Sequence, residues 1–219
     1  MGAKIVDFCT FAWYNLGIDK LTSFRGCTVI KALEEKILKE GKVLPGDILK
    51  VDGFLNHCLD IPFLLEMGKE IARLYENQQI TKILTIETSG IPIAFAAAQF
   101  MNVPVVFVKK NKTGNMSENV YSTMITSYTR KTEYRAVVSK EFLCKDDKVL
   151  VVDDFFATGN ALKGLIDLLD QAGAELVGCA VAIEKGFQGG GDELRAKGIR
   201  VESLAIVESM TDDSLTFRK

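Results

Sequence analysis

The chain has 219 residues, of which 47% are hydrophobic and 26% are charged, a composition typical of a folded globular protein. Its formal net charge of −2 excludes a strongly basic overall field, so we expect no nucleic-acid partner. No apolar stretch reaches the ~20 residues of a membrane span, so we expect no membrane partner. The 5 cysteines form no C-x-x-C pair, which favours a reducing cytoplasmic location over a zinc site or disulfide framework.

Residues 1–30 differ in composition from the rest, since they hold the only tryptophan, Trp13, among several aromatic side chains. Asp7 interrupts the apolar run and no small-residue cleavage pattern follows, which argues against a signal peptide. We interpret this segment as an N-terminal extension of uncertain order, either an added helix or a piece foreign to the fold. Residues 31–219 are predicted to form a single domain.

Two helices are predicted in the first third of the chain. Near Ala32 the pattern becomes periodic, and we assign Leu33, Ile37 and Leu38 to one helical face before a glycine ends it. A second helix is predicted over 62–77, where apolar residues recur at helical spacing behind a proline, which is favoured in a first turn.

Three runs rich in valine and isoleucine, at 82–87, 103–110 and 147–154, predict buried strands. They lack polar alternation, which is typical of parallel strands covered on both faces. Helical stretches follow the first and third runs, and two more strand candidates lie at 175–184 and 199–207. This alternation predicts the α/β class, with an open, mainly parallel sheet flanked by helices.

Two segments interrupt the alternation. Residues 111–135 are polar and contain a period-2 stretch, VYSTMITSYT, which predicts a lid or an extended hairpin. Residues 189–191 are three glycines in a row, which we interpret as a flexible turn before a helix capped by Asp192.

The turn from the third strand into its helix is predicted to bind a phosphate. With a glycine at the bend, successive backbone N–H groups can converge at the positive helix terminus. A threonine hydroxyl in the turn adds one donor. The residues of this turn are Ala157, Thr158, Gly159, Asn160 and Ala161.

Asp153 and Asp154 precede this turn. Their charges oppose a second phosphate, but their oxygens can accept hydrogen bonds from hydroxyls or support a hydrated Mg²⁺. A phosphorylated sugar meets the demands of both the acids and the turn. The alternative interpretation is structural: a strand end, an acidic turn and a helix N-terminus also coincide in α/β proteins without a site.

Two nucleotide-binding motifs are not matched. Gly159 and Gly164 have the spacing of a P-loop, but Leu165 and Ile166 stand where that loop needs lysine and serine or threonine. No G-x-G-x-x-G occurs, so a dinucleotide site is not indicated.

The stretch VLVVDDFFATGNA, residues 149–161, resembles the signature of type I phosphoribosyltransferases, in which hydrophobic residues precede two acids and an A-T-G turn. Over about residues 32–210 the chain is similar to the bacterial members of that family that act on xanthine. Ala161 departs from the pattern, because many members have a hydroxyl residue there, which leaves the phosphate one donor fewer. The resemblance implies an open parallel sheet with a small hood formed by the N-terminal and C-terminal segments and a long flexible loop.

The resemblance also implies a purine-salvage reaction. Ribose 5-phosphate passes from phosphoribosyl pyrophosphate to N9 of xanthine, which gives xanthosine 5'-monophosphate and pyrophosphate with Mg²⁺ present. Asp153 and Asp154 would then contact the ribose hydroxyls and favour a cationic transition state, with the metal held mainly by substrate and these acids as possible outer contacts. A homodimer is implied as well.

The remaining site residues are also implied by the resemblance. The pyrophosphate loop would consist of Glu87, Thr88, Ser89 and Gly90, and the lysines that neutralise the leaving group would be Lys109 and Lys110, with Lys112 beside them. The purine would be bound by Leu49, Asn56, Lys185 and Phe187.

Two other functions stay open. The chain could act on guanine, hypoxanthine or adenine instead. It could also be a non-enzymatic purine regulator that senses phosphoribosyl pyrophosphate, although the roughly 30 residues before the resemblance are too few for a DNA-binding domain.

Overall fold

The computed structural model describes residues 29–111, 119–126, 132–211 and 213–219. The prediction for the N-terminal extension therefore lies outside the described residues, except for 29–30. Parts of the polar segment also lie outside them, including Lys112.

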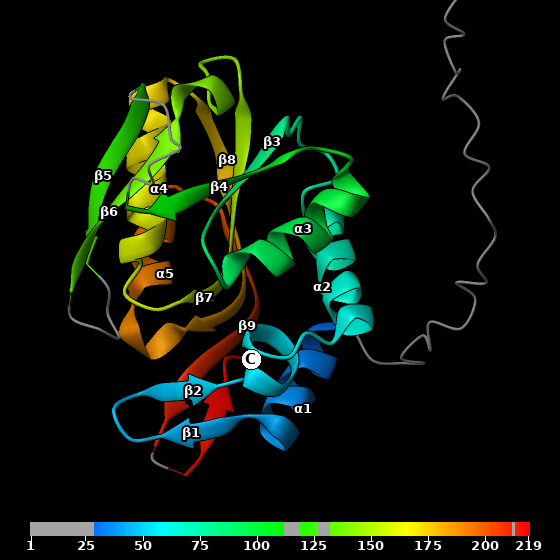
Figure 1. Ribbon diagram of the computed structural model, residues 1–219. Helices are drawn as coiled ribbons and strands as arrows, with labels where there is room; N and C mark the ends of the chain where they lie inside the picture. Colours follow the sequence, from blue (N-terminus) through cyan, green and yellow to red (C-terminus); the bar gives the residue numbers. More distant parts are fainter. Residues whose placement is uncertain (1–28, 112–118, 127–131, 212) are drawn as a thin grey trace, which may run out of the picture.

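Within the described residues, the centre of the fold is an 8-stranded sheet in the order β10-β9-β8-β7-β3-β4-β6-β5 (Figure 1). The strands from β9 to β4 pair in parallel, while β10 at one edge and the β6–β5 pair at the other are antiparallel. The predicted mainly parallel sheet is confirmed. The bounds are β3 (Lys82–Ile86), β4 (Val105–Lys110), β5 (Val120–Thr126), β6 (Glu133–Ser139), β7 (Lys148–Phe156), β8 (Glu175–Lys185), β9 (Val201–Met210) and β10 (Leu215–Phe217).

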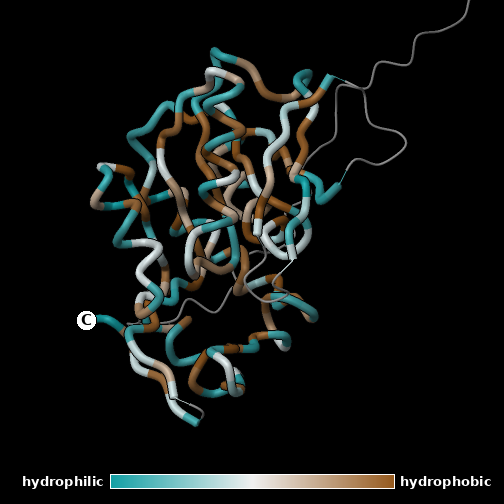
Figure 2. The backbone as a smooth tube through the Cα atoms, turned by 90° about the vertical axis from the view of Figure 1, so that its left-hand side faces the viewer, coloured by the Kyte–Doolittle hydropathy of each residue, from teal (hydrophilic) through white to brown (hydrophobic). Residues whose placement is uncertain are grey.

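Helices cover both faces of the sheet, which explains why its strands are apolar throughout. In β7, Leu150 and Val152 belong to the core under α1, α2 and α3, whereas Val149 and Val151 belong to the core under α4. Figure 2 shows the hydrophobic residues gathered in the central strands. No helix in the described ranges is both long and apolar enough to cross a membrane. The helices are α1 (Val29–Glu40), α2 (Ile61–Leu74), α3 (Gly90–Met101), α4 (Asn160–Ala172) and α5 (Gly190–Ala196).

A small substructure lies beside β9 and the C-terminus at one end of the sheet (Figure 1). It consists of α1, the hairpin β1 (Lys42–Leu44) and β2 (Ile48–Lys50), and the wide helical turn η2 (Asp52–Asn56). Short helical turns η3 (Lys140–Phe142) and η4 (Gly186–Gln188) occur elsewhere. The hood inferred from the resemblance remains a prediction.

The assignment of Leu38 to the buried face of α1 is wrong. Leu33 and Ile37 are buried, but the Leu38 side chain is 61% exposed. Five positions separate Leu38 from Leu33, and at 3.6 residues per turn this places the two side chains on different faces.

The prediction that Asp192 caps a helix is also wrong. The helix α5 begins at Gly190, and its N-cap residue is Gly189, which has φ 74°. Asp192 lies inside the first turn, where its carboxylate binds the guanidinium groups of Arg195 and Arg218.

Gly68 allows α2 to approach α3 closely, because a Cβ at this position would collide with the Ala96 backbone. Gly68→Ala should therefore lower the free energy of unfolding by about 1–3 kcal/mol, despite the higher helix propensity of alanine. The measurement is urea unfolding followed by circular dichroism. Gly53→Ala is the matched control, since a Cβ there meets no atom within 4 Å. Equal stability of both variants would contradict the close approach.

Candidate functional site

The turn between β7 and α4 has the geometry predicted for an anion site. β7 ends at Phe156, α4 begins at Asn160, and Gly159 between them has φ 84°, a conformation that favours glycine. The N-cap residue of α4 is Gly159, which has no side chain to accept a hydrogen bond from the backbone N–H groups of the first turn. These donors carry the partial positive charge of a helix N-terminus.

The turn lines a hollow of about 160 Å³. Its opposite wall comes from the β5–β6 pair and includes Thr126 and Tyr134. The Asn160 Nδ2 group donates to the Thr126 backbone oxygen at 3.2 Å, so this side chain holds the wall in place. Among the predicted phosphate-binding residues, all five from Ala157 to Ala161 line the hollow.

Asp153 and Asp154 lie before this turn and are both 5% exposed. The Asp154 backbone N–H donates to Asp153 Oδ1 at 2.9 Å, and Ser89 Oγ donates to Asp154 Oδ1 at 3.1 Å. The structure therefore joins the acid pair to the predicted pyrophosphate loop. Gly90 packs still closer, because a Cβ there would lie 2.5 Å from Asp153 Oδ1.

Burial raises the pKa of the Asp153 carboxyl well above its ordinary value, and the neighbouring Asp154 charge raises it further. The positive charge of Lys110 acts in the opposite direction on this pKa. Burial also raises the pKa of the Tyr134 phenol, and the Asp153 charge adds to that effect. Asp153, Lys110 and Tyr134 thus influence one another electrostatically.

The end of β4 meets the same loop. The Lys110 backbone N–H donates to Glu87 Oε1 at 2.5 Å, and the peptide bond from Glu87 to Thr88 is cis. The Lys110 ammonium lies 5.3 Å from the centre of the Tyr134 ring. Lys109 is partly buried and pairs with Val137 of β6.

The four predicted purine-binding residues have different environments. The Lys185 ammonium donates to the Asp47 backbone oxygen at 2.7 Å, and burial lowers the pKa of this lysine. It thereby connects the end of β8 to the β1–β2 turn. Leu49 is buried in β2, whereas the side chains of Asn56 and Phe187 are exposed.

Two features that support the site were not found from the sequence. Gly190 packs against the Ala157 and Thr158 backbone, so this glycine of the run allows close packing on the turn after β7. Glu184 is fully buried and accepts hydrogen bonds from Arg195 at 2.9 and 2.7 Å. Three consecutive glycines were a usable signal for the first feature, whereas the pairing of Glu184 with Arg195 follows from the fold.

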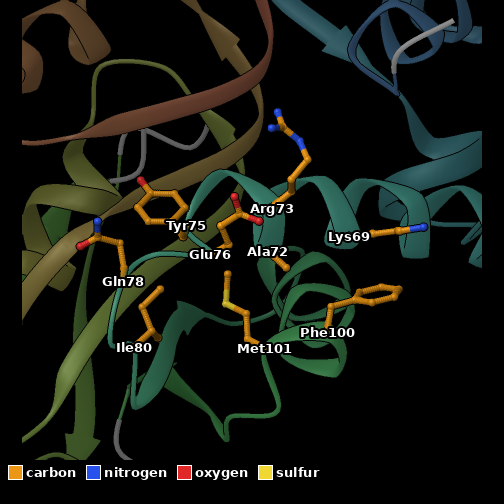
Figure 3. A pocket seen from close by; sticks show the side chains of 9 residues that line it. All are labelled: Lys69, Ala72, Arg73, Tyr75, Glu76, Gln78, Ile80, Phe100 and Met101. Atoms are coloured by element: carbon orange, nitrogen blue, oxygen red, sulfur yellow. The ribbon is translucent and has the colours of Figure 1, made fainter.

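A larger hollow of about 420 Å³ lies elsewhere, between the C-terminal ends of α2 and α3 (Figure 3). Ile80, on its wall, directly precedes β3, so the hollow lies where that strand begins. Ligands of open parallel sheets bind beyond the carboxyl ends of the strands, which favours the turn after β7 as the functional site over the hollow at the start of β3. The residues that line the hollow between α2 and α3 are Lys69, Ala72, Arg73, Tyr75, Glu76, Gln78, Ile80, Phe100 and Met101.

The family described as phosphoribosyl transferase domain matches residues 62–205, which include the acid pair, the loop after β3 and the turn after β7. The chain belongs to the phosphoribosyltransferase family. Xanthine phosphoribosyltransferase 1 of Clostridium perfringens is 53% identical over 190 residues, which cover 86% of this chain and 100% of that protein. Xanthine phosphoribosyltransferase of Clostridioides difficile is 50% identical over 190 residues, with the same coverage of both proteins.

Solved structures support the fold of this phosphoribosyltransferase. APRTase from Giardia lamblia, complexed with 9-deazaadenine, has a TM-score of 0.68 and 23% identity over 81% of this chain and 98% of that chain. Adenine phosphoribosyltransferase from Rhodothermus marinus has a TM-score of 0.66 and 22% identity over 80% of this chain and 99% of that chain. At these identities the likeness concerns the fold alone.

The raised pKa of Asp153 predicts a pH-dependent cost to stability. Protonation favours the folded state, so wild-type stability should fall as pH rises from below the ordinary value of 3.8 through the raised pKa. Asp153→Asn lacks this loss, so it should melt above the wild type at pH 7.5, by about 2–4 °C for each kcal/mol gained.

The measurement is thermal unfolding by calorimetry over a series from about pH 4 to about pH 8, which covers the rise through the raised pKa. The advantage of Asp153→Asn should shrink toward the acid end of the series. Asp146→Asn, which changes an exposed carboxylate, is the control and should melt with the wild type at every pH. A constant difference between Asp153→Asn and the wild type would contradict the raised pKa.

Proposed function

We propose that the chain is a purine-salvage enzyme that converts xanthine and phosphoribosyl pyrophosphate to xanthosine 5'-monophosphate and pyrophosphate. The observation that carries the proposal is the proximity of a buried acid pair to two anion-facing features, the loop after β3 and the turn after β7. The relatives at 50–53% identity that are named for xanthine support the choice of base.

The 5'-phosphate is assigned to the hollow after β7. Backbone N–H groups at the start of α4, together with the Thr158 hydroxyl, supply its donors, and each hydrogen bond to a charged group contributes about 1.5–3 kcal/mol. The side chain of Asn160 already bonds to Thr126, so this residue contributes through its backbone. Ala161 contributes in the same way, which makes the missing hydroxyl tolerable.

Asp153 and Asp154 are assigned to the ribose. In the transfer, the bond from C1 of ribose to a pyrophosphate oxygen breaks and its electron pair leaves with pyrophosphate. N9 of xanthine forms the new bond to C1, and the N9 proton is released. Positive charge develops on the sugar ring during this step, and ionised carboxylates beside the ring stabilise it.

The leaving pyrophosphate is assigned to the loop Glu87–Gly90, at the N-terminus of α3. The helix terminus and Lys110 supply positive charge there, and Lys109 is the second cation of this strand end. Glu87 contributes structure, because its carboxylate accepts the Lys110 backbone N–H. Thr88 offers its hydroxyl and backbone N–H, and Ser89 offers its backbone N–H, because the Ser89 hydroxyl already donates to Asp154.

Mg²⁺ fits this site as an ion carried mainly by the substrate. Within the described ranges, no group of three or more histidine, cysteine, aspartate or glutamate side chains is placed to hold a metal. Asp153 and Asp154 provide the oxygen ligands that Mg²⁺ prefers and can contact its water shell. When bound, Mg²⁺ would neutralise charge on the pyrophosphate.

The purine is assigned to the region between Lys185 and the β1–β2 hairpin. Lys185 is a donor suited to a purine oxygen and unsuited to the amino group of adenine. Phe187 offers apolar surface to the ring and Asn56 offers an amide, whereas the side chain of Leu49 is buried and would contribute by shaping the hairpin.

We also propose that the enzyme is a cytoplasmic homodimer. Phe95 and Phe100 of α3 are 62% and 45% exposed, and Phe107 of the adjoining β4 is 42% exposed. Exposed aromatic side chains of this size are enriched at protein interfaces.

The proposal is tested by offering xanthine, guanine, hypoxanthine and adenine in turn to the purified protein with Mg²⁺ and phosphoribosyl pyrophosphate. Release of pyrophosphate should favour xanthine by at least about 100-fold in kcat/KM. Asp154→Asn is the matched inactive variant and should lower kcat by about 10²–10³. Preference for another base, or binding of phosphoribosyl pyrophosphate without turnover of any base, would replace xanthine transfer by one of the alternatives.

Lys185→Met keeps the length of the side chain and removes its charge. It should raise the KM for xanthine by about 10- to 100-fold, the value of one charged hydrogen bond, with little change in the KM for phosphoribosyl pyrophosphate. Steady-state kinetics with each substrate varied separately provide the measurement. Lys42→Met, in the β1–β2 hairpin that Lys185 contacts, is the control, and equal losses for both substrates would contradict a role of Lys185 in base binding.

A further inference from the structure

Tyr134 lies at the site although neither the sequence motifs nor the resemblance assign it a role. Its side chain lines the hollow of about 160 Å³ opposite the anion-binding turn. The ring is partly buried against the core under α4, which restricts its movement. Tyr134 therefore forms a fixed wall of the hollow.

The face of this ring holds a cation. Lys110 Nζ lies 5.3 Å from the ring centre, within the range in which the ring quadrupole attracts an ammonium. The backbone of Lys110 is fixed separately, by its N–H bond to Glu87 Oε1. Across the described part of the chain, no carboxylate forms a salt bridge with the Lys110 ammonium, so the ring is the contact that orients it.

The held ammonium acts on the functional site. Its charge lowers the pKa of Asp153, against the effect of burial, and so favours the ionised carboxylate. The same cation is positioned where a phosphorylated substrate brings negative charge. A lysine side chain has many conformations in solution, so holding it beforehand reduces the entropy lost when the substrate binds.

We propose that Tyr134 is a positioning residue for phosphoribosyl transfer: its ring holds the Lys110 ammonium beside the loop Glu87–Gly90, where the pyrophosphate group is assigned, before phosphoribosyl pyrophosphate binds. This inference rests on the proposed function as far as the donor substrate is concerned, and it is independent of which purine accepts the sugar. The aromatic face is the functional part of Tyr134, and its hydroxyl is dispensable.

The chain offers a matched control. Tyr121, on the neighbouring strand β5, holds the Lys140 ammonium 5.0 Å from its ring centre. Tyr121 packs against the same core as Tyr134 but is absent from the wall of the hollow. Tyr121→Leu thus removes an equivalent ring and cation pair from the same hairpin away from the site.

The experiment measures the Kd of phosphoribosyl pyrophosphate by titration calorimetry with Mg²⁺, and KM and kcat with the best base. Tyr134→Leu should weaken binding about 3- to 10-fold, with a smaller change in kcat, and Tyr134→Phe should match the wild type. Lys110→Met should weaken binding at least as much as Tyr134→Leu. The double variant should be no weaker than Lys110→Met alone, because the ring acts through the lysine.

Three outcomes would overturn the inference. Additive losses in the double variant would separate the ring from Lys110, and a loss in Tyr134→Phe equal to that in Tyr134→Leu would assign the effect to the hydroxyl. An equal loss in Tyr121→Leu would assign it to general destabilisation of the hairpin. Failure of the proposed function looks different, because the wild-type protein itself would then transfer no ribose 5-phosphate to any purine.

Discussion

The site depends on the burial of two adjacent carboxylates near the end of a central strand. Taking ionised carboxylates out of water is costly unless other groups compensate. Asp154 receives a hydrogen bond from Ser89, and Asp153 receives one from the Asp154 backbone. The compensation is incomplete, since burial still raises the pKa of Asp153 well above its ordinary value. The enzyme thus retains an unfavourable burial of carboxylate charge, which the proposed contact with a sugar hydroxyl or a hydrated cation would relieve.

The parallel topology brings the compensating groups to that strand. β3 and β8 flank β7, and α3 and α4 start directly beyond β3 and β7. The start of α3 therefore contacts the acid pair directly through Ser89 and Gly90, and α4 starts four residues after β7 ends. Gly90 allows α3 to lie against the acid pair, because a side chain there would collide with Asp153. Gly190 allows α5 to lie against the turn after β7, because a side chain there would collide with the backbone of that turn.

Two peripheral links connect this centre to the rest of the enzyme. Lys185 joins the end of β8 to the β1–β2 turn through the Asp47 backbone oxygen, so a purine that bound to Lys185 would also affect the hydrogen bond to this turn. Next to it in the chain, Glu184 is held from the other side by Arg195. Because Glu184 is fully buried, loss of Arg195 would remove its charged partner and leave the Ser203 hydroxyl as a donor, which makes this pair a structural requirement of the β8 end.

Local patterns in the sequence were sufficient for the class of fold and for the glycine turn between β7 and α4, whose role as a phosphate site stays a prediction. Unbroken apolar runs indicate strands covered on both faces, and a glycine between a strand and a helix indicates a turn with converging N–H groups, because both are short-range consequences of backbone geometry. Leu38 was misassigned because its spacing of five residues from Leu33 does not fit one face of a helix with 3.6 residues per turn. The pairing of Ser89 with Asp154, the contact of Lys110 with Tyr134 and the position of Gly190 were decided only by the tertiary structure. Each joins residues that are far apart along the chain, and only the order of the strands in the sheet brings them together.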